Sequence, residues 1–414
     1  MSCSPRLHIL QHVRDTEKLF NNHTGFVLFD PSQNKTLAAY NERQYFTPAS
    51  NTKIFTFFTS IRLLGDSAIA FKYKLANDSL IVWGMADPSF LNPAVFTNQR
   101  SYNFLQSQGE KIFLSQSHFQ TTALGAGWAW DDYAYGFSPE RSPFSLYGNL
   151  LSIQKNTARK LVATPSFFQP YLLEETDVHA AEDIVRDVDA NTLRHYSGKR
   201  NRFKWTVPIH FSAPLTASLL RDTLHKSVEV IHRPVAKDAQ TLRSVPLDSL
   251  LKVMMVESDN HIAEQLLLQC AAVVSDTLQP EIAIRYATQQ LHADLPDRPQ
   301  WVDGSGLSRY NLFTPRSIVH VWNKIYTAIP EKRLLSLLAV GGKSGTIKNW
   351  YKAEVPYIYA KTGTLSNNHS LSGFIKTKSG KTLIFSLMSN NYVASTNELR
   401  KQMEKILKHI YEKY

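Results

Sequence analysis

The sequence is poor in cysteine, with only Cys3 and Cys270 in 414 residues. Two cysteines exclude a disulfide framework and a thiolate zinc site. The 14 histidines show no H-E-x-x-H or other metal-ligand spacing. We therefore expect neither a metal nor another cofactor.

Long apolar runs are also lacking, since no stretch approaches the roughly 20 apolar residues of a membrane-spanning helix. The first residues, MSCSPRLHILQ, lack the apolar core of a signal peptide. These absences leave two interpretations: an intracellular protein, or a mature chain that begins after a cleavage site. Cys3 lies where a trimmed lipoprotein carries its cysteine, and a chance cysteine fits equally well.

Acidic residues are the minority among the charges, with 35 Asp and Glu against 46 Lys and Arg, for a net charge of +11. This balance favours anionic surroundings such as nucleic acid, a membrane surface or an acidic polymer, and a positively charged soluble surface explains it as well. The basic residues are spread along the chain without an aromatic-basic module, so we expect no nucleic-acid partner. The length and the 43% of apolar residues predict a globular protein of two or three units.

The middle of the chain differs from its two ends. Residues 76–239 carry short alternating strands and aromatic turns, which predict an inserted β-rich region. Residues 1–75 and 240–414 predict a second domain that the insertion interrupts. In it a helix at 5–20 precedes a hairpin, and helical spacing returns from about 246.

The end of the chain predicts a hairpin followed by an amphipathic helix. SLSGFIKT and TLIFSLMSN form the hairpin around KSGK. The basic face of the helix could touch a membrane, but we expect its apolar stripe to pack on the preceding sheet. That stripe consists of Leu399, Met403, Ile406, Leu407 and Ile410.

A serine three residues before a lysine occurs at Ser32–Lys35, Ser50–Lys53, Ser152–Lys155 and Ser249–Lys252. A serine hydroxyl is a weak nucleophile that needs a base within hydrogen-bond reach, and positions i and i+3 share one face of a helix. Three of the pairs fall in a turn, an alternating strand and a helix interior. Only Ser50 opens a buried helix, whose N-terminus favours a developing alkoxide.

Two further motifs follow in the chain. Ser258-Asp259-Asn260 occurs once, between two helical runs, and alone it indicates an ordinary helix-break turn. Lys361-Thr362-Gly363 follows a strand. Its rivals Lys343-Ser344-Gly345 and Lys378-Ser379-Gly380 lie in a Gly-rich loop and in a hairpin turn. Only Lys361 stands on a strand, which can hold an ammonium group and line up backbone amides along a substrate.

S-x-x-K, S-D-N and K-T-G in this order are typical of penicillin-binding proteins and related β-lactamases. MMVESDNHIAEQLL, DGSGLSRYNLFTP, GTIKNWY and AKTGTL resemble the D-alanyl-D-alanine carboxypeptidase/endopeptidase family, the class C low-molecular-weight penicillin-binding proteins (peptidase family S13). GMADPSF and GWAWDDYAYGFSP resemble its inserted domain. The resemblance implies an α+β fold: a β-lactamase/transpeptidase-like domain, with helices flanking an antiparallel sheet, and a large β-rich insertion.

The resemblance also implies roles for the motif residues. Ser50 would attack the carbonyl of the penultimate D-Ala, and Lys53 would take its proton. Ser258 and Lys361 would help to move a proton to the leaving D-Ala amine, while Asn260 would hold the substrate amide.

Other residues would bind the substrate. Thr362 and Thr364 would bind its terminal carboxylate, and the backbone N–H groups of Ser50 and Thr364 would form the oxyanion hole. An aspartate of the insertion would read the amino end of the peptide side chain, with Asp132 as the candidate and Asp131 as the alternative. Ser305 in DGSGLS does not fit G-x-S-x-G, and the family similarity suggests a structural loop near the site.

The expected function is a serine-type D-alanyl-D-alanine carboxypeptidase/endopeptidase that acts on peptidoglycan peptides and is acylated by β-lactams. Its substrate implies a periplasmic or cell-envelope location, with peripheral membrane or lipid attachment left open. One alternative is a β-lactamase or esterase on the same scaffold, although we find no E-x-x-L-N segment to supply the glutamate of a class A β-lactamase. Another alternative is a non-hydrolytic peptidoglycan-binding protein, against which the three intact motifs argue.

Overall fold

The computed structural model describes residues 5–95, 100–109, 111–199 and 202–414, so Cys3 lies outside the described residues. The chain forms two compact units. The first consists of Met1–Thr59, Leu251–Asp259 and Ile284–Tyr414, and the second of Ser60–Leu250 and Asn260–Ala283. Among the described residues, no helix is both long enough and apolar enough to cross a membrane.

A six-stranded antiparallel sheet forms the centre of the first unit, in the order β14-β15-β16-β17-β1-β2. Strands β1 and β2, at one end of the sheet, are the predicted N-terminal hairpin, and β16 and β17 are the predicted C-terminal one. The strands are β1 (His23–Asp30), β2 (Lys35–Tyr40), β14 (Ala339–Val340), β15 (Ile358–Leu365), β16 (Asn368–Lys376) and β17 (Thr382–Asn390).

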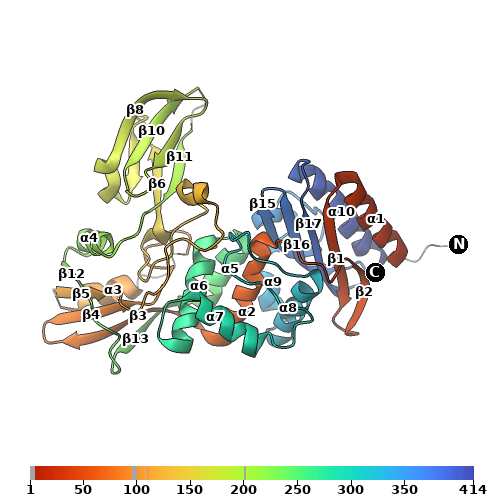
Figure 1. Ribbon diagram of the computed structural model, residues 1–414, viewed down its shortest axis with the longest axis horizontal. Helices are drawn as coiled ribbons and strands as arrows, with labels where there is room; N and C mark the ends of the chain where they lie inside the picture. The colour runs from red at the N-terminus through yellow and green to blue at the C-terminus, as the bar shows by residue number, and fades with distance from the viewer. Residues whose placement is uncertain (1–4, 96–99, 110, 200–201) are drawn as a thin grey trace. The chain divides into compact units, whose positions relative to one another are not determined.

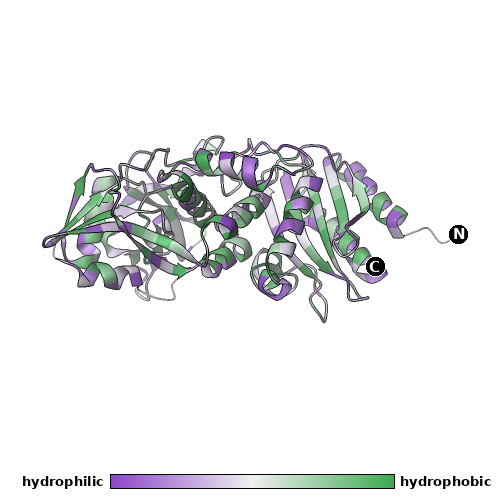
Figure 2. Cartoon of the chain, turned by 90° about the horizontal axis from the view of Figure 1, so that it is seen from below, coloured by the Kyte–Doolittle hydropathy of each residue, from purple (hydrophilic) through white to green (hydrophobic). Residues whose placement is uncertain are grey.

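Alternate side chains of this sheet face different helices, as the two-residue period of a strand requires. Leu371 and Ile375 of β16 join the core formed with α1 (Pro5–Phe20) and α10 (Thr396–Lys413). On the opposite face Ser372 and Phe374 contact Trp322 of α8 (Pro315–Ala328). Figure 1 shows α1 and α10 side by side against the sheet, and Figure 2 shows long hydrophobic stretches along its strands.

The final helix buries the predicted apolar stripe in full, which confirms the packing on the sheet. Shorter elements complete the first unit. They are η1 (Ala49–Thr52), η5 (Ala287–Leu291), α9 (Glu331–Ser336) and η6 (Gly345–Ile347), and the helices α2 (Lys53–Leu63) and α5 (Leu247–Val256) each contribute part of their length.

The second unit is built around a five-stranded sheet in the order β12-β5-β4-β3-β13. Strands β4, β5 and β12 are parallel, whereas β3 is antiparallel to both of its neighbours. The strands are β3 (Ser67–Ala76), β4 (Ser79–Gly84), β5 (Lys111–Ser115), β12 (Ser227–Ile231) and β13 (Gln240–Pro246). This sheet begins before residue 76 and ends after 239, and the predicted domain boundaries at 75 and 240 stay a prediction.

Two three-stranded sheets lie between β5 and β12 in the chain, in the orders β11-β6-β7 and β8-β10-β9. Two of their strands, β6 and β7, are the predicted strands LSIQKN and KLVAT, whereas the predicted strands SLIVWG and KIFLSQ are β4 and β5 of the five-stranded sheet. The strands of the two three-stranded sheets are β6 (Leu150–Lys155), β7 (Leu161–Thr164), β8 (Leu172–His179), β9 (Asp183–Arg186), β10 (Leu193–Gly198) and β11 (Lys204–Pro208). The helical elements of the unit are α3 (Arg100–Ser107), η2 (Trp130–Ala134), η3 (Tyr147–Asn149), η4 (Ser166–Tyr171), α4 (Ala213–Leu224), α6 (Asn260–Ser275) and α7 (Pro280–Tyr286).

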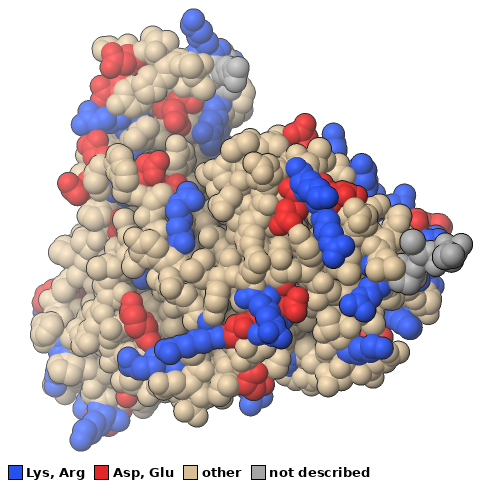
Figure 3. All heavy atoms as spheres, turned by 45° about the vertical axis from the view of Figure 1, so that its right-hand side comes forward, with Lys and Arg blue, Asp and Glu red and all other residues tan. Residues whose placement is uncertain are grey.

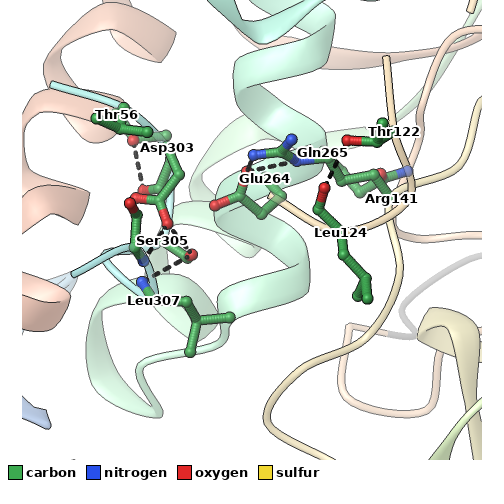
Figure 4. Close-up of polar contacts among 12 residues, drawn as sticks. Thr56, Thr122, Leu124, Arg141, Glu264, Gln265, Asp303, Ser305 and Leu307 are labelled. Carbon is green, nitrogen blue, oxygen red and sulfur yellow. Dashed lines mark hydrogen bonds and ion pairs between the residues drawn. The ribbon is translucent and has the colours of Figure 1, made fainter. Parts of the chain in front are cut away.

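A buried ion pair anchors α6 within this unit. The Arg141 guanidinium donates to the Glu264 carboxylate from Nε at 2.9 Å and from Nη2 at 2.6 Å, and both side chains are almost fully buried (Figure 4). Next to it Ser145 Oγ lies 2.7 Å from His261 Nε2. Removal of one partner of a buried pair leaves an uncompensated charge and costs about 3–5 kcal/mol.

Candidate active site

Ser50 lies in the 3₁₀ turn η1, which continues directly into α2. Thr52 Oγ1 donates to the Ala49 carbonyl at 2.9 Å and closes the turn. Ala49 has a left-handed backbone with φ of 48°, which a residue with a Cβ adopts only at a cost of about 1–3 kcal/mol. Ser50 therefore follows a strained residue, a feature that clusters at functional sites.

The amine of Lys53 lies beside the Ser50 hydroxyl. Its Nζ is 3.0 Å from Ser50 Oγ and 2.6 Å from the Ser305 carbonyl oxygen, and the side chain is completely buried. The rival pairs lie elsewhere as predicted: Ser32 in the β1–β2 turn, Ser152 on β6 and Ser249 on α5. Of the four matches, Ser50–Lys53 is the one with a buried lysine.

A compact loop at 303–311 positions the Ser305 carbonyl. The buried Asp303 carboxylate accepts hydrogen bonds from Gly306 N at 2.8 Å, Ser308 N at 2.7 Å and Asn311 Nδ2 at 2.7 Å. Thr56 Oγ1 donates to the Gly304 carbonyl and ties the loop to α2 (Figure 4). Ser305 thus contacts Lys53 through its backbone, while its hydroxyl lies within the loop near Asp303.

Ser258 and Lys361 form a second serine–lysine pair. Ser258 has a left-handed backbone, with φ of 64°, in the turn between α5 and α6. Lys361 lies on β15 and its Nζ donates to Ser258 Oγ and to the Thr362 carbonyl, both at 2.7 Å. Burial, with a contribution from the charge of Lys53, holds the pKa of Lys361 well below its usual range. The two lysines are thus electrostatic neighbours.

Gly363 lets β15 approach the turn that carries Ser50. A Cβ at this position would lie 2.4 Å from the Pro48 carbonyl oxygen and 2.9 Å from Ser50 N. Asn51 links the same two elements, because its Nδ2 donates to the Lys361 carbonyl at 3.3 Å and its Oδ1 accepts a short hydrogen bond from Ser372 Oγ. The strand and the turn are therefore held together by backbone contact and by side chains.

The threonines of the third motif have partners in the same unit. Thr362 Oγ1 donates to Thr346 Oγ1 at 2.7 Å. Thr364 is exposed, and its Oγ1 lies 2.8 Å from His369 Nδ1. His369 is buried, and desolvation lowers its pKa to about 3, so the ring is neutral at neutral pH.

This arrangement supplies the parts of nucleophilic catalysis: a hydroxyl, an amine in contact with it, and a second serine–lysine pair nearby. The D-Ala-D-Ala carboxypeptidase 3 (S13) family matches residues 6–410. The chain belongs to this family. The match confirms the predicted family and the predicted class of D-Ala-D-Ala carboxypeptidases.

Some relatives of this S13 family chain match nearly its whole length. D-alanyl-D-alanine carboxypeptidase DacB of Haemophilus influenzae is 24% identical over 94% of this chain and 90% of the relative. The crystal structure of penicillin binding protein 4 from the same species covers 97% of this chain and 99% of that one, with 22% identity and a TM-score of 0.79. This likeness confirms the predicted α+β fold.

A more distant solved structure is the penicillin G-acylated predatory endopeptidase of Bdellovibrio bacteriovorus in complex with an immunity protein. It is 16% identical, covers 94% of this chain and 92% of that one, and has a TM-score of 0.53. At this identity the likeness concerns the fold.

Two residues predicted for this S13 family site belong to the second unit. Asn260 begins α6, and its Nδ2 donates to the Phe137 carbonyl at 2.6 Å. Asp132 lies in η2 and is partly exposed. Their roles at the site stay predictions.

Sequence reasoning missed several residues of the site. It did not find Thr346, Asn51 or Ser372, and it treated Ser305 as a loop residue without assigning a contact for its carbonyl. Two signals were available for Thr346: GGKSGT, whose K-S-G resembles the third motif and is followed directly by Thr346, and GTIKNWY, a family-like segment that contains it. The hydrogen bonds of the other residues depend on tertiary contacts that no local pattern encodes.

Proposed function

We propose that this protein is a serine-type D-alanyl-D-alanine carboxypeptidase/endopeptidase of peptidoglycan that works through an acyl-enzyme on Ser50. The observation that carries the proposal is the 3.0 Å contact between the buried Lys53 amine and the Ser50 hydroxyl. Membership of the D-Ala-D-Ala carboxypeptidase family supports the substrate. The substrate in turn places the enzyme in the periplasm or cell envelope.

The reaction begins with the transfer of the Ser50 proton to a neutral Lys53 amine while Oγ attacks the carbonyl carbon of the penultimate D-Ala. The peptide C–N bond then breaks, and the leaving D-Ala amine takes a proton relayed through Ser258 and Lys361. Water hydrolyses the resulting ester and restores Ser50. The depressed pKa of Lys361 and its 2.7 Å contact with Ser258 support a relay by this pair.

Substrate binding falls to the third motif and its surroundings. Thr362 and Thr364 bind the terminal carboxylate, and the N–H groups of Ser50 and Thr364 stabilise the oxyanion. The close approach of Gly363 to Ser50 N supports this pairing of amides. Asn260 holds the substrate amide and Asp132 reads the amino end of the peptide side chain.

A β-lactam carries a strained amide that the same serine opens, so β-lactams are covalent inhibitors in this proposal. The penicillin G-acylated relative is consistent with it. In the absence of a class A glutamate, we expect slow deacylation and therefore a persistent label.

Labelling with a fluorescent penicillin tests the acyl-enzyme. The wild-type protein should carry one covalent label, and Ser50→Ala should carry none. Ser249→Ala, at the S-x-x-K pair of α5, is the matched control and should be labelled like wild type. An unlabelled wild type, or undiminished labelling of Ser50→Ala, would refute the proposal.

D-Ala release should be compared with cross-link cleavage on defined muropeptides. This measurement separates carboxypeptidase from endopeptidase action and uses the same serine variants. Tight muropeptide binding without release of either product would instead indicate a non-hydrolytic binding protein. Rapid turnover of a chromogenic cephalosporin would indicate a β-lactamase.

A further inference from the structure

The second unit contains a cavity of about 630 Å³, within the range of 300–1,000 Å³ of small-molecule sites. One wall is the segment around η2, and the other is formed by β9 and β11. None of the eight residues predicted for the S13 site lines it, although Asp131, the alternative side-chain reader, does. The cavity therefore needs an explanation of its own.

The first wall is unusually rich in exposed aromatic rings. Trp130 is 79% exposed, Tyr135 56% and Phe137 49%. The rings of Tyr135 and Phe137 are nearly parallel, with an interplanar angle of 6° and centroids 5.6 Å apart. Large apolar surfaces of this kind are costly to leave in water and mark interaction sites.

The aromatic wall is held firmly in place. A Cβ at Gly136 would lie 2.8 Å from the Thr206 carbonyl oxygen, so the segment packs directly on β11. Tyr133 Oη donates to the carbonyl of the buried Arg186 at 3.2 Å, and Asn260 Nδ2 donates to the Phe137 carbonyl at 2.6 Å. A ligand would thus meet rings that are already ordered, which lowers the entropy cost of binding.

The acidic and basic side chains that line the cavity are equal in number. The lining carries two acids, Asp131 and Asp183, and two bases, Lys204 and Arg202, and Asp183 lies 3.6 Å from Arg202 in an ion pair. Together with Thr206 they offer both hydrogen-bond donors and acceptors. Two acids and two bases give no net charge, which disfavours a polyanion or a polycation and favours a neutral, strongly hydrogen-bonding ligand.

We propose that this cavity binds a saccharide, namely the N-acetylated glycan of peptidoglycan. A pyranose ring has one flat face of C–H groups, which packs on the negative face of an aromatic ring, and a rim of hydroxyls, which charged and polar side chains bind. The aromatic wall and the neutral polar lining match these two surfaces. The inference rests on the proposed function only for the source of the saccharide.

Direct binding tests the proposal without requiring catalysis. The probe is tetra-N-acetylchitotetraose, titrated into the Ser50→Ala protein by calorimetry. We expect saturable binding that Tyr135→Ala weakens at least about fivefold. The matched control is Tyr171→Ala, which removes an exposed tyrosine of the same unit outside the lining and should bind like the parent.

Several outcomes would overturn the inference: no binding by the parent, equal binding by Tyr135→Ala, or Tyr135-dependent binding of a free stem pentapeptide in place of the saccharide. A second measurement tests whether the saccharide bound at this site is the glycan of peptidoglycan. The rate of D-Ala release from intact sacculi, divided by the rate from soluble pentapeptide, should fall at least about fivefold in Tyr135→Ala and not in Tyr171→Ala.

The two proposals fail separately. Chitotetraose binding without any D-Ala release would refute the peptidase and leave the saccharide site supported. Normal D-Ala release without saccharide binding would refute the saccharide site alone.

Discussion

Lys53 and Lys361 are both completely buried, and each amine donates to a serine hydroxyl and to a backbone carbonyl. Two ammonium groups are costly to hold together in a dry site, because burial disfavours each charge and the charges repel. Burial first and the Lys53 charge second lower the pKa of Lys361. The site therefore favours a state in which one amine is neutral and able to accept a proton.

Lys53→Met tests the base at Ser50. Methionine keeps the length and apolar stem of the side chain but cannot take a proton, so the rate of penicillin acylation should fall about 10²–10⁴-fold. Stopped-flow or gel-based labelling measures that rate. Lys252→Met, the exposed lysine of the Ser249–Lys252 pair, is the control and should acylate at the wild-type rate. Equal rates for both variants would exclude Lys53 as the base.

At the scale of elements, the sequence predicted where the three motifs lie: on a helix start, in a turn between helices and on a strand. These positions follow from local patterns of apolar spacing and turn residues. The left-handed backbone of Ala49 could not be predicted, because alanine has no preference for it and tertiary contacts impose it. The hydrogen bonds from Trp322 to Ser372 and from Ser372 to Asn51 could not be predicted either. They connect Trp322 with Asn51, which are more than 270 positions apart in the sequence.

The basic residues that are spread along the sequence are also spread over the folded chain where one face of it is drawn. On the face drawn in Figure 3, Lys and Arg side chains are spread over several places, often with Asp or Glu beside them. On this face the positive charges are interspersed with negative ones, so it presents no large region of a single sign.

Gly363→Ala tests the contact between β15 and the Ser50 turn. The added methyl would meet the Pro48 carbonyl and Ser50 N, which are backbone atoms that cannot rotate away. The strand must shift by several tenths of an ångström or more, and we expect acylation to fall about 100-fold. Gly65→Ala is the control: its Cβ would meet no atom within 4 Å, although its left-handed backbone makes it lose stability. Thermal unfolding measures the loss of stability separately from the loss of acylation. If Gly363→Ala were acylated at the wild-type rate, the proposed contact would be contradicted.

Across the whole molecule, three buried histidines couple the fold to pH. Desolvation lowers the pKa values of His261, His292 and His369 to about 3 each. In the unfolded chain a histidine titrates near 6.5. The unfolded state therefore binds more protons between pH 6.5 and 3, and the free energy of unfolding falls as the pH drops through this range.

His292 offers the sharpest test of this coupling. Its ring packs among Phe55, Phe58 and Trp301, and neither ring nitrogen has a hydrogen-bond partner among the described residues. His292→Leu removes the proton-binding group and keeps the apolar contacts. Between pH 6.5 and 5 the wild type should lose up to about 2 kcal/mol more stability than this variant, since each pH unit is worth about 1.4 kcal/mol for one group. Urea unfolding of the wild type and of His292→Leu at both pH values measures the difference. If His292→Leu and the wild type lost the same stability on acidification, His292 would have to be protonated inside the fold.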